Sequence, residues 1–113
     1  MQFRNALLFA LVLIPTLAFG HATIAHEEVV LIAGGEAEVA PANAKRLLLV
    51  VQASLPTVNC LPAGAYDDSA DGVLNVDTVP VLVQVPDSAL ALHCVNRDTE
   101  NSVTIDWTEI VAP

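Results

Sequence analysis

The sequence predicts an all-β protein, a small antiparallel β-sandwich of about seven or eight strands, immunoglobulin-like or jelly-roll in outline, with one disulfide bond. Three observations lead to this expectation. Short segments rich in β-branched residues recur along the chain. Proline, glycine and short polar stretches separate them at intervals that leave no room for long helices. Two cysteines stand where they could link two of these segments. A small β-barrel is the alternative architecture.

The first 20 residues have the pattern of a secretory signal peptide. A basic residue near the amino end precedes the apolar stretch 6–20, and Ala18 and Gly20 are placed like the small residues before a cleavage site. A membrane anchor needs about 20 apolar residues, and Pro15 interrupts this shorter run. We therefore expect a signal peptide over 1–20 that is cleaved near Gly20.

The remaining residues, 21–113, are expected to form a single secreted or periplasmic domain, with cleavage after Ala22 or Ala25 as alternatives. This part holds three basic and all thirteen acidic residues, so its formal net charge is 3 − 13 = −10. Such a field repels nucleic acid and anionic lipid. It fits a solvated acidic surface, a bound cation or a basic partner.

Cys60 and Cys94 are expected to form the disulfide bond, because paired cysteines are typical of exported chains. For a closed loop of about 35 residues, the chain-entropy treatment gives about 3.8 kcal/mol of stabilisation. A metal site built from Cys94 and His93 is disfavoured, because neighbours on a strand point to opposite faces.

The first half of the chain is expected to hold a polar lead and two short strands, in the order 21–26, 28–33 and 36–40. Gly34 and Gly35 form a turn signal between the strands. Pro41 ends the second strand or places it at a sheet edge. The unbroken apolar run 47–51 then predicts a strand at the centre of a sheet with both faces covered. A buried helix of the same length is the alternative.

The second half is expected to hold an edge strand and a hairpin. Apolar residues alternate over 79–85, and Pro80 and Pro86 favour a sheet edge. The segment 89–112 predicts two strands around a polar turn at 96–102, in the middle of the core. The faces that should be buried are Leu90, Leu92 and Cys94 on the first strand, and Val103, Ile105 and Trp107 on the second.

The acidic segment 67–78 resembles the calcium loop of EF-hand and dockerin modules. The ligands that the resemblance implies are Asp67, Ser69, Asp71, Val73 through its carbonyl, Asn75 and Asp77. Gly72 holds the sixth position, where such loops turn sharply. Thr78 stands at position twelve, where the family has a bidentate acid, and the flanks do not look helical. The sequence favours an acidic β-turn at this position, with Asp71-Gly72 as the turn dipeptide. A calcium ion that orders the loop is the hypothesis that the resemblance adds.

Histidine offers a second metal hypothesis. Cleavage after Gly20 would give His21 an α-amine beside its imidazole, a pair that chelates copper in secreted β-sandwich proteins. His26 or His93 could complete this alternative copper site. A blue-copper site is excluded, because the only methionine is Met1 and both cysteines are expected to be oxidised.

Catalysis has little support in the sequence. The chain has no nucleophile elbow, zinc-protease motif, P-loop or dinucleotide glycine pattern. Asp106 and Glu109 are three residues apart on an expected strand, so their carboxylates should point to opposite faces. We expect an exported, non-catalytic binding module for a protein or glycan ligand. The alternatives are a structural subunit that self-associates through strand edges, and a periplasmic copper-binding protein.

Overall fold

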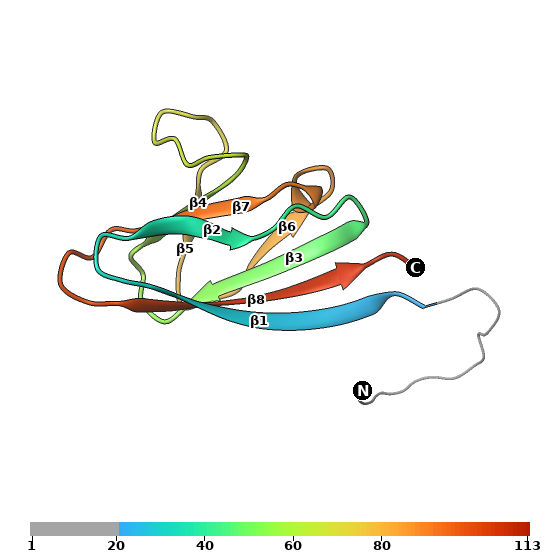
Figure 1. Cartoon of the computed structure of the whole chain (residues 1–113), viewed down its shortest axis with the longest axis horizontal. Coiled ribbons are helices and arrows are strands. Elements are labelled where there is room, and N and C mark those ends of the chain that lie inside the picture. The colour runs from blue at the N-terminus through green and yellow to red at the C-terminus, as the bar shows by residue number, and fades with distance from the viewer. Residues whose placement is uncertain (1–20) are drawn as a thin grey trace.

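The computed structural model describes residues 21–113; the expected signal peptide and its cleavage at Gly20 lie outside the described residues. Eight strands form two four-stranded antiparallel sheets, with one 3-10 turn, η2 (Asp87–Ala89) (Figure 1). The strands of the first sheet, in spatial order, are β1 (Thr23–Leu31), β8 (Val103–Val111), β3 (Arg46–Ala53) and β6 (Val81–Gln84). Those of the second are β2 (Glu36–Ala40), β7 (Leu92–Asn96), β4 (Val58–Pro62) and β5 (Leu74–Val76). The all-β prediction is confirmed.

The strands pair in a nested order. Ladders join β1 to β8, β2 to β7, β3 to β6 and β4 to β5. This is one long antiparallel hairpin wound into two sheets, which is the jelly-roll topology. The ladders β3–β8 and β4–β7 complete the two sheets. Of the two sandwich outlines that the sequence predicted, the strand order matches the jelly-roll.

The core lies between the inner faces of the two sheets, where side chains alternate along each strand. Val103, Ile105 and Trp107 of β8 are buried there, as predicted. The predicted disulfide is also confirmed: Cys60 of β4 and Cys94 of β7 stand directly opposite each other, and both are fully buried. The bond therefore joins neighbouring strands of the second sheet on the face that packs against the first.

The predicted hairpin over 89–112 is wrong, because β7 and β8 belong to different sheets. The link between them crosses the sandwich and is fixed by side-chain hydrogen bonds. The buried Asn96 amide donates to the carbonyl oxygens of Asn101 (2.8 Å) and Ile32 (3.2 Å). Asp98 Oδ1 accepts from the backbone N–H of Glu100 and of Asn101. Turn residues and alternation predict that the chain reverses direction and that both strands bury one face. A chain that crosses to the facing sheet meets these conditions as well as a hairpin within one sheet does.

The start of the domain also differs from the prediction. The segment 21–26, expected to be a polar lead, enters β1, which begins at Thr23 and ends at Leu31. The turn at Gly34 (φ +68°) then carries the chain from the first sheet to the second, where β2 begins. Gly34 N–H donates to the Asp98 carbonyl at 2.8 Å, so the two crossings between the sheets support each other.

Strand β3 lies inside the first sheet, between β8 and β6, as its apolar run predicted. The expectation that both its faces are covered is wrong. Leu49 and Val51 are buried, but Leu47 is 47% exposed and Val50 is only half-buried. No element of residues 21–113 packs over the outer face of this sheet, where Val30 of β1 is 62% exposed.

The other edge predictions hold in part. Strand β6 is an edge strand between Pro80 and Pro86, and β2 is an edge strand that ends before Pro41, both as expected. Leu90 does not share the buried face of Leu92 and Cys94: it follows η2, precedes β7 and is 45% exposed. Within residues 21–113, no helix has the length and apolar character needed to cross a bilayer.

Candidate functional site

The acidic loop 63–73 joins β4 to β5 and stands away from the second sheet (yellow-green in Figure 1). Arg97, just after β7, holds its base. The guanidinium forms an ion pair with Asp68 and donates to Tyr66 Oη at 3.0 Å and to Asn59 Oδ1 at 3.1 Å. It also lies 5.6 Å from the centre of the Tyr66 ring. Neither Arg97 nor Asp68 was among the predicted site residues, because the two are far apart in the sequence.

Most predicted calcium ligands have local hydrogen-bond partners. Asp67 Oδ1 accepts from the backbone N–H and the hydroxyl of Ser69, at 3.0 and 2.8 Å. Asn75 lies on β5, and its Oδ1 accepts from Asn59 Nδ2. Asp77 follows β5, and its Oδ1 accepts from the backbone N–H of the next residue. These bonds are typical of Asx turns and cross-strand amide pairs.

The glycine at the tip of the loop adopts the turn conformation that the calcium pattern requires, but the carboxylates around it do not converge. Gly72 adopts φ +86°, the left-handed conformation expected at the sharp turn. However, Asp67, Asp71 and Asp77 do not lie within ligand distance of one another as a group. The calcium site therefore stays a prediction.

Hydrogen bonds lower the pKa of two loop carboxyls, and desolvation raises that of the tyrosine. The backbone N–H of Ser69 lowers the pKa of Asp67. The hydrogen bond from Tyr66, together with Arg97, lowers the pKa of Asp68. Desolvation is the main cause of the raised pKa of Tyr66. Both carboxylates thus keep their charge at neutral pH, and the loop presents negative charge to the solvent.

The three histidines of the alternative copper site are dispersed. His21 precedes β1 and is exposed. His26 lies on β1 of the first sheet, whereas His93 lies on β7 of the second. His93 Nδ1 donates to the Ala63 carbonyl at 2.8 Å, and its Nε2 is 3.9 Å from Glu38. The copper site stays a prediction that depends on processing at Gly20.

His26 has a different set of neighbours that the sequence analysis missed. The β1–β8 register places Glu28 opposite Asp106 and His26 opposite Thr108. One signal in the sequence was available: His26 and Glu28 are two apart, which puts them on one face of a strand. That signal was lost because 21–26 was interpreted as a polar lead.

Strand β1 is the longest edge strand of the described domain. Its nine residues pair on one side with β8, while the other edge strands have four (β6), five (β2) and three (β5) residues. All residues from Thr23 to Glu28 are exposed. Figure 1 shows β1 (blue) running along the outside of the first sheet, where no other strand of residues 21–113 pairs with its second edge.

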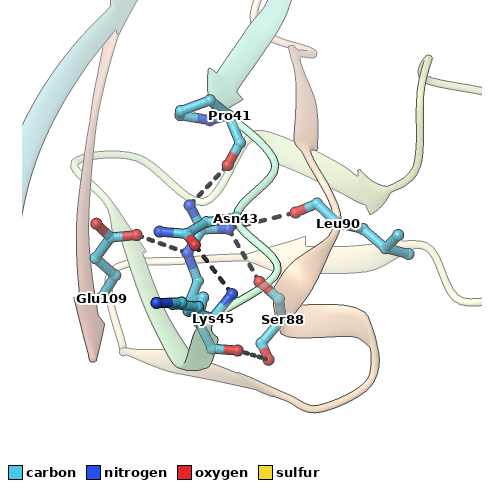
Figure 2. Close-up of polar contacts among 7 residues, drawn as sticks. Pro41, Asn43, Lys45, Ser88, Leu90 and Glu109 are labelled. Carbon is cyan, nitrogen blue, oxygen red and sulfur yellow. Dashed lines mark hydrogen bonds and ion pairs between the residues drawn. The ribbon is translucent and has the colours of Figure 1, made fainter. Parts of the chain in front are cut away.

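A second polar cluster, around Arg46, is buried inside the fold. Arg46 of β3 is 1% exposed, and its Nε donates to Glu109 Oε1 at 2.8 Å. Its two terminal nitrogens donate to the carbonyls of Ser88 (2.9 Å) and Pro41 (2.7 Å), and Figure 2 labels both of these acceptor residues together with Glu109. The guanidinium also lies 5.6 Å from the Trp107 ring centre. With its donors used inside the fold, Arg46 fixes loops and offers nothing to a ligand.

The buried pair also settles the geometry of the carboxylates near Trp107. Glu109 faces Arg46 inside the sandwich, and Asp106 lies on the outer face of β8, so the two point to opposite sides as predicted. They do not form a carboxylate pair.

Comparison of the chain with protein-family models, with curated proteins and with solved structures finds no match.

Proposed function

We propose that this chain is an exported, non-catalytic binding module whose β1 edge accepts an extended, basic segment of a partner protein. The observation that carries this proposal is the nine-residue strand β1, which among the strands of residues 21–113 pairs with β8 alone. An unpaired strand edge presents a row of backbone N–H and C=O groups that can bond to an added strand. Main-chain bonds supply affinity in such strand addition, and the flanking side chains supply specificity.

Charge favours a basic partner. Glu27 and Glu28 occupy the middle of β1, and residues 21–113 carry a formal charge of 3 − 13 = −10. Opposite charges on neighbouring strands stabilise their pairing, and a basic segment is drawn toward an acidic domain during encounter.

The same charge disfavours a second copy of this chain as the occupant. If two β1 strands paired antiparallel about their midpoints, Glu27 of one copy would stand opposite Glu27 of the other. Like charges directly opposite each other destabilise a strand pair. We therefore assign the edge to a different protein, and self-assembly becomes an outcome of the test.

Calorimetric titration of the purified protein with synthetic peptides tests this assignment. We expect heat of binding with a nine-residue peptide of alternating lysine and threonine, and none with the matching glutamate–threonine peptide. A Glu27→Lys/Glu28→Lys variant should reverse that preference. The matched control, Glu36→Lys/Glu38→Lys on the β2 edge, should keep it.

Two results would contradict the proposal. Equal binding of both peptides would show that the charge of the β1 edge does not determine which peptide binds. An equal loss of lysine-peptide binding in the β2 control would show that total charge, and not the β1 edge, attracts the peptide.

We also propose that calcium orders the acidic segment 67–78, a role separate from partner binding. The support is the ligand pattern and the left-handed backbone of Gly72. Millimolar calcium should then give heat in a titration and raise the melting temperature. Absence of both effects would reject this ion.

A further inference from the structure

We propose that His26, Glu28 and Asp106 form a binding site for a divalent cation of the zinc class on the outer face of the first sheet. One candidate ligand atom from each residue lies within 4.8 Å of the other two. The group is the one set of at least three such side chains that residues 21–113 bring together. The inference is independent of a partner at the β1 edge.

The sheet itself positions the three side chains. His26 and Glu28 are alternate residues of β1, so they project from the same face. The antiparallel register places Asp106 of β8 directly opposite Glu28. Asp106 is also the diagonal neighbour of His26, because it lies two residues before Thr108, the partner of His26. Cross-strand and diagonal neighbours are within reach of each other on one face. All three ligands thus come from the two longest strands of the domain, each of nine residues.

A neighbouring hydroxyl fixes the orientation of the imidazole. His26 Nδ1 and Thr108 Oγ1 share a hydrogen bond of 3.0 Å. This leaves Nε2 on the side of the carboxylates, where it lies 4.0 Å from Asp106 Oδ1. Metal-ligating histidines usually have their second ring nitrogen held in this way, which orients the ring toward the ion.

An unpaired oxygen distinguishes this group from a solvated acidic face. Asp106 Oδ1 has less than 1 Å² of accessible surface and no hydrogen-bond partner among the described residues. An oxygen cut off from water and left unpaired is costly, and native structures keep few of them. A cation between Asp106, Glu28 and His26 supplies the missing partner.

The donor set selects the kind of cation. One imidazole nitrogen and two carboxylate oxygens suit zinc, which takes nitrogen and oxygen ligands at about 2.0–2.2 Å. Calcium takes oxygen ligands and has no use for the imidazole. The His26 side chain is 55% exposed and Glu28 is exposed, so water can complete the coordination of the cation from that side. Copper(II) should bind the same ligands more tightly, in the order that holds for divalent first-row metals.

Calorimetric titration of the purified protein with zinc chloride tests the site. We expect one zinc ion per chain, and at least a tenfold rise in Kd in each of His26→Gln, Glu28→Gln and Asp106→Asn. The matched control is Glu27→Gln, which removes the same charge from the adjacent position on the opposite face of β1. It should leave Kd within about twofold. His21→Gln, which removes an exposed histidine outside the site, should behave like the control.

Three outcomes would overturn the site: no heat with millimolar zinc, unchanged affinity in His26→Gln and Asp106→Asn, or an equal loss in Glu27→Gln. The last would mean diffuse attraction to an acidic surface. Melting curves without zinc check that each variant folds; if Asp106→Asn does not, the His26 and Glu28 variants decide. Since no peptide is present, these results are separate from those that test the β1 edge.

Discussion

At the scale of single residues, the most consequential side chain is a buried cation. Arg46 joins β3 to Glu109 of β8 and to the loops that contain Pro41 and Ser88. Ser88 completes the contact, since its hydroxyl donates to the Arg46 carbonyl at 3.1 Å. Nothing in the sequence distinguishes Arg46 from a solvated arginine at the start of a strand. Its role appears only when distant loops meet at one end of the sandwich.

Replacing Arg46 with methionine should destabilise the fold strongly. Breaking one partner out of a buried ion pair costs about 3–5 kcal/mol, because the remaining charge and carbonyls stay buried and unpaired. Urea unfolding of Arg46→Met measures the loss. Arg97→Met, which breaks an exposed pair with Asp68, is the control and should cost less. A loss in Arg46→Met no larger than in this control would contradict the structural role.

Asp98 should make stability depend on pH. Hydrogen bonds from the backbone N–H of Glu100 and from Asn101 lower the pKa of Asp98 below its ordinary value of 3.8. A carboxyl whose pKa is lower in the folded state stabilises the fold above its unfolded pKa, and this contribution is lost as pH falls through the folded pKa. The difference in unfolding free energy between the native chain and Asp98→Ala should therefore be largest near neutral pH and shrink below 3.8. Urea unfolding of both proteins near neutral pH and below pH 3.8 measures this difference. An equal difference in unfolding free energy under the two conditions would show that the carboxylate charge is not responsible.

At the scale of elements, the disulfide joins β4 to β7 across a sequence separation of 34 residues. Closing a loop of that length restricts the unfolded chain and stabilises the fold by about 3.8 kcal/mol. The Cys60→Ala/Cys94→Ala variant should lose about that much in a urea titration. The native chain unfolded in the presence of a reductant should match it. A variant as stable as the native chain would show that the core holds the second sheet without the bond.

Alternation in the sequence predicted which side chains of the elements face inward, but not which strands pair. Val103, Ile105 and Trp107 were placed correctly because period two determines the face of a strand. The pairing of β7 with β8 was wrong because the same inward faces arise when the chain crosses to the opposite sheet. The candidate cation site was missed for a related reason. Asp106 meets His26 and Glu28 only through the β1–β8 ladder, which joins the two ends of the domain.

At the scale of the whole molecule, the charge and the free edge make opposite predictions about self-assembly. A long exposed edge invites pairing between copies, while the formal charge of residues 21–113, 3 − 13 = −10, and the glutamates of β1 oppose it. We expect charge to prevail and the purified protein to be a monomer. Size-exclusion chromatography over a range of concentrations measures this. Ladders or fibres would favour the structural-subunit alternative.

Export is the other prediction at this scale. Intact-mass measurement of the protein recovered from the periplasm or medium should give a first residue of His21. A first residue after Ala22 or Ala25 would keep export but remove the N-terminal copper hypothesis. A chain that retains residues 1–20 would contradict the signal-peptide interpretation.

Hydrogen exchange of the β1 backbone amides, measured by NMR, tests the central claim that this edge is free and accepts a strand. In the protein alone, alternate amides of Thr23–Leu31 should be protected by pairing with β8, and those between them should exchange rapidly. Adding the lysine–threonine peptide should protect the rapid set. Protection of every β1 amide before any peptide is added, or no change after it, would contradict the account.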